Sequence, residues 1–298
     1  MPPRATICLT FDFDAISLWV GPFAATSPSM ISRGEFGPVG VERILALLAR
    51  FGIPATFFVP GHTAETYPAS LRAIVDAGHE IGHHCYLHEN PCALESRERE
   101  HAVLHRGLDA LWNVAGIRPT GYRSPSWDNS PHTVGLLLEH GFRYESSLMG
   151  SDFSPYWCRV GDRHQPDGPY LFGAPVDLVE MPVSWLFDDF PHFEYLSRGG
   201  QVRPGLSAGS KVEEIWREEF YFMHAEVADG VYTLTMHPQV IGRGHRMLML
   251  ERLVGHFAAH PGVEFSTLGD AAERVRGRLP GNASPSDAGT RRSEPTDA

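Results

Sequence analysis

Short apolar runs alternate with amphipathic segments along most of this chain, and this rhythm limits the possible folds more than any other feature of the sequence. Apolar runs of strand length lie at 6–13, 55–59, 79–82, 142–145, 178–181, 231–236 and 263–266. Segments with helical spacing of apolar residues lie at 41–51, 68–77, 95–115, 131–140, 212–228, 247–259 and 268–276. Strands interleaved with helices of this length predict a mostly parallel sheet covered by helices. About seven strands favour an α/β fold of one domain, a distorted (β/α) barrel of the TIM-barrel type.

Two segments depart from this rhythm. Residues 15–40 contain several Gly, Pro and Ser residues together with Trp19, Phe23 and Phe36, and we expect a long ordered loop there. From residue 279 on, the chain is rich in Ser, Pro, Asp and Arg without apolar periodicity. We therefore expect the barrel to span residues 1–278 and residues 279–298 to form a disordered tail.

The net charge of the chain argues against certain classes of binding partner. The chain has 36 acidic and 25 basic residues, a formal net charge of −11, which argues against binding to nucleic acid and to anionic membranes. We see no apolar stretch of membrane-spanning length and no secretory signal, and the four cysteines have no disulfide-scaffold spacing. A cytoplasmic protein without disulfides is the expectation. The sequence says little about oligomeric state, although a homo-oligomer would be compatible with its aromatic loops.

Two aspartates end the first expected strand. Because side chains alternate along a strand, Asp12 and Asp14 share one face. Two carboxylates at the end of an apolar strand are costly unless a cation lies nearby. The alternative is a pair of solvated aspartates, and this motif alone does not decide between the two.

Four histidines fall within ten residues at 79–88. His84 and His88 are four residues apart, so one helical turn would place both imidazoles on the same side. Two imidazoles and a carboxylate suit a Zn²⁺-like ion and leave positions open for water and substrate. The alternative is a set of surface or core histidines without a ligand.

Two further motifs follow expected strands. The first, at 121–127, contains Arg123 and Trp127, and the second, at 233–238, is a strand that ends in His237. A lone histidine at a strand end is more often structural than catalytic. Neither motif carries a function by itself.

Together the four motifs resemble those of the polysaccharide deacetylase (NodB-homology) family, over about residues 5–275. The resemblance implies a distorted (β/α) barrel that binds one divalent metal ion. It also implies that the ligands are Asp14, His84 and His88. Zinc is the first expectation for the ion, with cobalt or iron as alternatives.

The same resemblance assigns the catalytic roles. Asp12 would be the general base that activates water, and Arg123 would orient it. His237 would be the general acid for the departing nitrogen, and Trp127 would help to wall the pocket. An unreactive amide requires a strong nucleophile, a charge sink and a proton for the amine, and these residues offer a candidate for each.

The first motif departs from the commonest family pattern, because Phe13 separates two aspartates that are usually adjacent. The same separation is found in a subgroup that includes small-amide and cyclic-imide hydrolases. Cys85 also replaces the usual Ser or Thr after the first ligand histidine, and no partner for His237 can be assigned from the sequence.

This pattern and the expected location favour hydrolysis of a carbon–nitrogen bond in a small cyclic or linear amide or imide. We expect aromatic side chains to contact that substrate, namely Trp19, Tyr86, Trp127 and Trp185. One alternative is an N-deacetylase of glycans that contain N-acetylglucosamine, with an oligosaccharide as partner. A second is a non-catalytic barrel that binds a sugar or an amide, and a third is a metal-free hydrolase.

Overall fold

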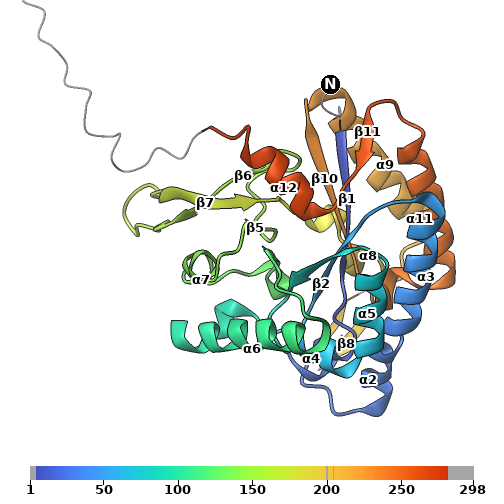
Figure 1. The fold of residues 1–298 in the computed structure, drawn as a ribbon, viewed down its shortest axis with the longest axis horizontal. Coiled ribbons are helices and arrows are strands. Elements are labelled where there is room, and N and C mark those ends of the chain that lie inside the picture. Colours follow the sequence, from blue (N-terminus) through green and yellow to red (C-terminus); the bar gives the residue numbers. More distant parts are fainter. Residues whose placement is uncertain (1–4, 199–200, 204, 281–298) are drawn as a thin grey trace, which may run out of the picture.

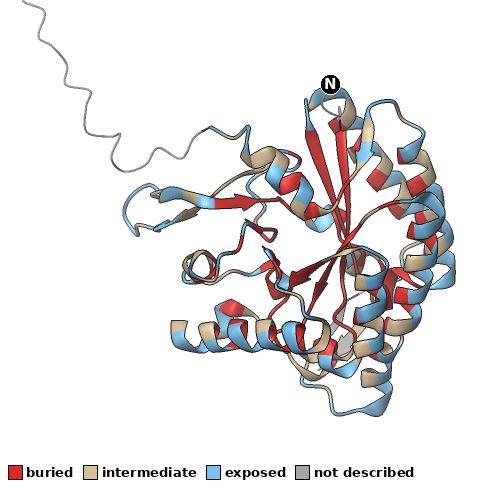
Figure 2. Cartoon of the chain, in the orientation of Figure 1, coloured by how far each residue is buried: buried red, intermediate tan, exposed pale blue. Residues whose placement is uncertain are grey.

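The structure of the protein is a computed structural model, in which residues 5–198, 201–203 and 205–280 are described. A curved sheet forms the centre of the molecule, and helices lie along its outer side (Figure 1). Most strands of the sheet are buried, while the strands at 156–160, 174–180 and 263–265 are partly exposed (Figure 2). The α/β class and the distorted-barrel architecture expected from the sequence are confirmed.

Nine strands of the described chain form the curved sheet, in the order β10-β1-β2-β3-β4-β5-β7-β6, with β11 also pairing with β1. Neighbours are parallel except β6 and β7, which are antiparallel. The strands are β1 (Ala5–Asp12), β2 (Thr56–Val59), β3 (Glu80–His83), β4 (Gly121–Tyr122), β5 (Tyr144–Glu145), β6 (Tyr156–Val160), β7 (Ala174–Glu180), β10 (Gly230–Met236) and β11 (Val263–Phe265). A separate hairpin is made by β8 (Leu196–Arg198) and β9 (Gln201–Arg203).

The longer helices cover the sheet, and the shorter ones follow strand ends. The longer helices are α2 (Pro28–Glu35), α3 (Gly37–Phe51), α5 (Pro68–Asp76), α6 (Arg97–Ala115), α7 (Thr133–Glu139), α9 (Gly209–Glu226), α11 (Gly244–Ala258) and α12 (Leu268–Arg276). The shorter helices are α1 (Ile16–Val20), α4 (Gly61–Thr66), α8 (Asp189–Phe193) and α10 (Pro238–Ile241). Within the described part of the chain, no helix has the length and apolarity that a membrane span needs.

The hydrophobic pattern of β1 explains its central place. All eight of its residues are buried, and it pairs with β10 on one side and with β2 and β11 on the other. A strand buried on both faces reads as a continuous apolar run, which is typical of a parallel sheet with helices outside. The last residue of β1, Asp12, breaks that run at the carboxyl end of the sheet.

The expected loop at 15–40 is wrong, because most of this segment is helical. Helix α1 starts at Ile16, and α2 begins at Pro28, which occupies a first-turn position where the missing N–H costs nothing. Gly34 allows the two helices to meet, since a Cβ there would lie only 2.5 Å from the carbonyl oxygen of Ala15. The segment is therefore a packed helical layer beside the site.

Only the first two residues of the predicted tail, 279 and 280, are described in the structure. Leu279 packs against a buried cluster that includes Leu268, and the carbonyl of Pro280 accepts a hydrogen bond from Trp157 Nε1 at 2.8 Å. Residues 279 and 280 thus belong to the fold. The rest of the predicted tail, 281–298, lies outside the described residues.

Candidate active site

The predicted polar residues all follow the carboxyl ends of neighbouring strands. Asp12 ends β1 and Asp14 lies two residues beyond it, while His84 follows β3, Arg123 follows β4 and His237 follows β10. These ends meet at one edge of a parallel sheet, where barrels of this type carry their chemistry. A cavity of about 580 Å³ opens there. It is lined by Asp12, Asp14, Leu18, Phe23, His84, His88, Ser126, Trp127, Trp185, Asp188, Phe190, Pro191, Glu194, Leu196 and His237.

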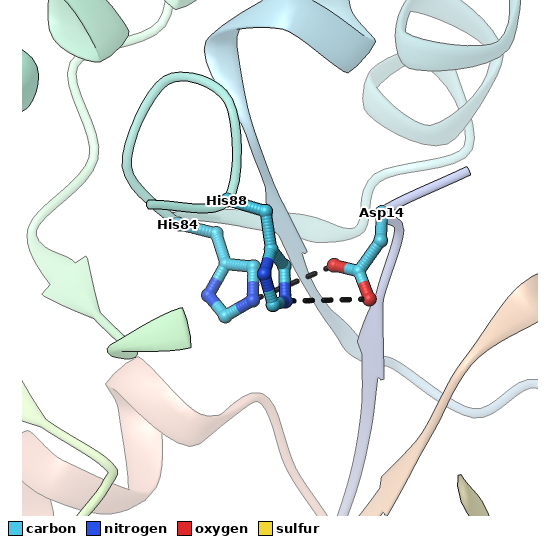
Figure 3. Close-up of side chains that lie close together, drawn as sticks. All are labelled: Asp14, His84 and His88. Carbon is cyan, nitrogen blue, oxygen red and sulfur yellow. Dashed lines mark ion pairs between the residues drawn. The ribbon is translucent and has the colours of Figure 1, made fainter. Parts of the chain in front are cut away.

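Asp14, His84 and His88 all line this cavity, and their side chains converge on one another (Figure 3). His84 Nε2 lies 3.4 Å from Asp14 Oδ1, and His88 Nε2 lies 3.7 Å from Asp14 Oδ2. All three side chains are buried, and one ligand atom from each lies within 4.8 Å of the others. Neither carboxylate oxygen of Asp14 has a hydrogen-bond partner. Because a buried carboxylate without donors is costly, this arrangement fits a bound cation.

The protonation of the two histidines also fits a metal site. Burial lowers the pKa of His84 to about 3 and that of His88 well below its usual value, so both rings are neutral. His84 Nδ1 donates to the backbone carbonyl of Arg123 at 2.7 Å, which leaves the Nε2 lone pair for a ligand bond. Neutral imidazole and carboxylate are ligands that suit zinc, iron and cobalt.

The chain segment between the two histidines is a tight turn and not the predicted turn of α-helix. Cys85 and His88 both have left-handed backbone conformations, with φ of 57° and 58°. The carboxylate of Glu89 accepts from the backbone N–H groups of Tyr86 and Leu87, at 3.2 and 2.6 Å, and so holds the turn. The spacing of four residues brings the two rings together, but through strain that local contacts stabilise.

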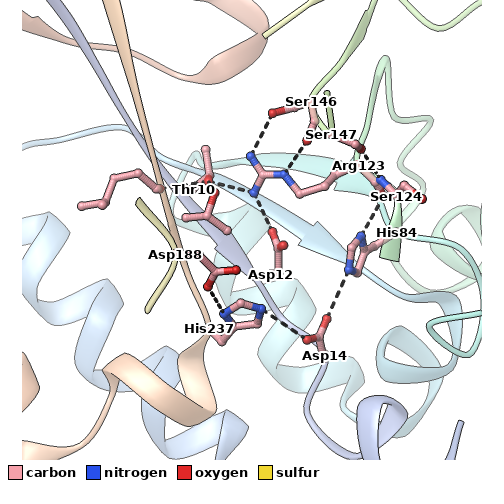
Figure 4. Close-up of polar contacts among 12 residues, drawn as sticks. Thr10, Asp12, Asp14, His84, Arg123, Ser124, Ser146, Ser147, Asp188 and His237 are labelled. Atoms are coloured by element: carbon pink, nitrogen blue, oxygen red, sulfur yellow. Dashed lines mark hydrogen bonds and ion pairs between the residues drawn. The ribbon is translucent and has the colours of Figure 1, made fainter. Parts of the chain in front are cut away.

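Arg123 lies against Asp12, as the sequence predicts (Figure 4). Its Nη1 donates to Asp12 Oδ1 at 2.7 Å and to Thr10 Oγ1 at 2.9 Å. Its Nε and Nη2 donate to the carbonyl and hydroxyl oxygens of Ser146, each at 3.0 Å. The guanidinium is therefore fixed on several sides and holds one oxygen of a buried carboxylate.

The partner of His237 is Asp189, which sequence reasoning missed. Asp189 Oδ1 accepts from His237 Nδ1 at 2.7 Å, and both carboxylate oxygens accept from the backbone N–H of His237 at 3.1 Å. Asp188 lies 3.6 Å from the same ring nitrogen, while Nε2 lies 3.7 Å from Asp14 Oδ2 (Figure 4). The adjacent aspartates in an aromatic segment were the available signal.

The two neighbouring carboxylates set the charge of this imidazole. Burial alone would lower the pKa of His237, but Asp188 and Asp189 outweigh it and raise this pKa well above its usual value. A protonated ring with Nδ1 held by Asp189 presents Nε2–H at the cavity, which suits a proton donor.

Two of the four predicted substrate-contacting aromatics line the cavity. The rings of Trp127 and Trp185 lie with centroids 4.4 Å apart and planes tilted by 31°. Ser126 and Trp127 adopt left-handed φ values of 57° and 53°. This strained turn directs the Trp127 ring toward the cavity wall.

Trp19 and Tyr86 do not line the cavity, so the structure does not bring these two predicted substrate contacts to the site. Trp19 is buried inside the helical layer with the Arg33 guanidinium 4.4 Å above its ring. The Tyr86 hydroxyl donates to Glu65, and Arg106 covers its ring at 3.5 Å. Leu18 and Phe23 supply the apolar wall on that side instead.

Comparison with known proteins identifies the family. The family profile described as polysaccharide deacetylase matches residues 2–145. A peptidoglycan deacetylase of Helicobacter pylori is 37% identical over 292 residues, covering 94% of this chain and 99% of that protein. This chain belongs to the polysaccharide deacetylase family.

Solved structures of relatives agree with this result. The crystal structure of a putative polysaccharide deacetylase from Mycobacterium smegmatis is 36% identical, with a TM-score of 0.83, over 95% of this chain and 94% of that one. An allantoinase shares the fold with a TM-score of 0.73 at 24% identity, over 92% of this chain and 91% of that one. The deacetylase is thus a hydrolase of a carbon–nitrogen amide bond, and its family is generally metal-dependent.

Proposed function

We propose that this deacetylase removes the acetyl group from N-acetylated amino sugars of a glycan, with N-acetylglucosamine units as the substrate class. The Helicobacter pylori relative, which it matches over nearly its whole length, is named a peptidoglycan deacetylase. This support favours the glycan alternative over the small cyclic or linear amide expected from the sequence. The cyclic-amide preference is not confirmed, since the allantoinase likeness concerns the fold alone.

One observation carries the proposal. A buried cluster of two imidazoles and one carboxylate, a carboxylate held by arginine, and an imidazole held by aspartate all line one cavity. Amide hydrolysis needs a polarised carbonyl, a base for water and an acid for the amine. The three groups supply these needs within a single space.

Asp14, His84 and His88 would hold one divalent ion, zinc first, with cobalt or iron as alternatives. When bound, such an ion supplies Lewis acidity toward the amide carbonyl and toward water. Asp12 accepts the proton of the attacking water, and Arg123 keeps that carboxylate correctly oriented. Because Arg123 occupies only Oδ1 of Asp12, the second oxygen is left for this proton transfer.

His237 completes the reaction on the other side of the substrate. As the carbon–nitrogen bond breaks, Nε2 of His237 donates its proton to the departing nitrogen. Asp189 keeps the proton on Nδ1 and stabilises the positive ring before transfer. Water adds its hydroxyl to the acetyl carbon, so the products are acetate and the free amino sugar.

The cavity size and lining also agree with a sugar substrate. A volume of about 580 Å³ is within the usual range for small-ligand sites. Trp127 and Trp185, whose tilted rings contact each other, give the cavity an apolar wall, and Trp185 is 46% exposed. We propose these two rings as the substrate contacts.

The proposal is tested with metal-loaded protein and two substrate sets. One set contains N-acetylglucosamine oligomers and peptidoglycan fragments, followed by acetate release and by mass loss. The second set contains cyclic imides and allantoin, followed by ring opening. Acetate release from the first set alone supports the proposal, while turnover of the second set alone contradicts it and restores the small-amide alternative. A protein that binds the oligomers and hydrolyses nothing would be the non-catalytic barrel.

A further inference from the structure

The His237–Asp189 pair is carried by two very short helices. Asp189 is the first residue of α8, which has five residues, and His237 is the N-cap of α10, which has four. Helices of this length do not persist by themselves, and their last carbonyl groups need outside donors. The geometry of the pair therefore depends on what holds the far ends of both helices.

One arginine side chain reaches both of these ends. Arg246, on α11, donates from Nη1 to the carbonyl of Val240 in α10 at 2.8 Å. Its Nη2 donates to the carbonyl of Phe193, the last residue of α8, at 3.1 Å. The guanidinium also lies 4.7 Å from the centroid of the Phe193 ring, and the residue is only 6% exposed.

The contacts form a clamp across the two helices. The fork of a guanidinium has fixed angles, so two carbonyls bound to Nη1 and Nη2 are held at a fixed separation. Each helix carries one member of the proton-donating pair at its opposite end. A change in this separation would move Asp189 relative to His237.

We propose that Arg246 is a positioning residue that holds the Asp189 carboxylate against His237 Nδ1 by capping α8 and α10 together. It touches neither the cavity nor the predicted metal ligands. The expected effect of Arg246 on the rate rests on the proposed role of His237 as the acid. Its expected effect on the distance between Asp189 and His237 does not.

The test compares metal-loaded Arg246→Met, Arg246→Lys, Arg246→Ala and wild type. Arg252→Met is the matched control, since Arg252 is on the same helix and binds Glu213 and the Leu248 carbonyl instead. A crystal structure of each variant measures the distance from His237 Nδ1 to Asp189 Oδ1. Kinetics on the substrate that wild type hydrolyses measure kcat and KM separately.

We expect Arg246→Met to lengthen that distance beyond hydrogen-bond range and to lower kcat by about 10- to 100-fold, with KM and metal content little changed. Arg246→Lys should lose less, and Arg252→Met should behave as wild type. Added guanidinium ion should restore part of the activity of Arg246→Ala, which a general loss of folding would not allow.

An unchanged distance in Arg246→Met overturns the clamp, whatever the activity. An unchanged kcat despite a broken His237–Asp189 contact leaves the clamp in place and refutes His237 as the acid. If wild type hydrolyses no amide, the crystallographic comparison still decides the clamp. If Arg246→Met does not fold, the Arg246→Lys distance and guanidinium rescue decide it, and failure of both overturns it.

Discussion

Replacing Asp12 by Asn tests whether Asp12 acts as the general base and not as a metal ligand. Asn keeps an oxygen that can accept from Arg123 Nη1, now 2.7 Å from the carboxylate. The pair of opposite charges becomes a hydrogen bond from the charged guanidinium to a neutral amide oxygen, which still contributes about 1.5–3 kcal/mol. Arg123 is fully buried, so its charge would lose its counter-ion. We expect a loss of stability of about 1–3 kcal/mol, less than the roughly 3–5 kcal/mol for breaking a buried pair outright.

The loss of rate in Asp12→Asn should be larger than the loss of stability. Removing a general base costs about 10²- to 10⁴-fold in kcat, or about 3–5 kcal/mol in activation free energy. The assay measures initial rates at saturating metal, metal content by mass spectrometry, and unfolding in urea. Metal content should match wild type. A variant that loses its metal, or that keeps its rate within about tenfold, would show that the two aspartates have been assigned wrongly.

Three further predictions concern the two histidine ligands, Asp189 and the buried Glu180. His84→Ala or His88→Ala should lose metal and activity together, measured by metal analysis and rate; a variant that stays loaded and active contradicts the ligand set. Asp189→Asn should lower kcat by about 10²- to 10⁴-fold with metal retained, since Asn cannot stabilise the charged ring of His237, and an unchanged rate would remove Asp189 from the mechanism. Burial and the neighbouring Glu145 raise the pKa of Glu180 well above its usual value. The contribution of Glu180 to the free energy of unfolding is therefore fully present below the unfolded pKa of about 4.3 and is lost as the pH rises through the folded pKa. Glu180→Gln mimics the protonated acid, so its melting temperature relative to wild type should rise with pH, and a constant difference would refute the raised pKa.

The fold was predictable where local pattern and burial agree. Helix α12 begins and ends at the predicted residues, and β1 differs from its prediction by one residue at each end. Strand β6 escaped notice because it is an antiparallel edge strand with mixed exposure, so it shows neither a clean alternation nor a continuous apolar run. Pro28 suggested a loop, yet it starts a helix.

The candidate site was predictable where residues lie close to strand ends, because parallel strands bring those ends together. The approach of Asp12 to Arg123 follows from that rule. The pairing of Asp189 with His237 joins residues 48 positions apart through the path of α8, which no local pattern specifies. The same limit applies to Trp19, whose ring could have faced the cavity but is packed inward.

The central claim is that Asp14, His84 and His88 hold a catalytic metal ion, and metal content read beside activity tests it most directly. The protein is purified, analysed by mass spectrometry for metals, then assayed before and after chelation. The account predicts about one equivalent of divalent metal, with activity lost to the chelator and restored by zinc or cobalt. Metal-free protein with full activity would contradict it and would make these three residues substrate contacts in a metal-free hydrolase.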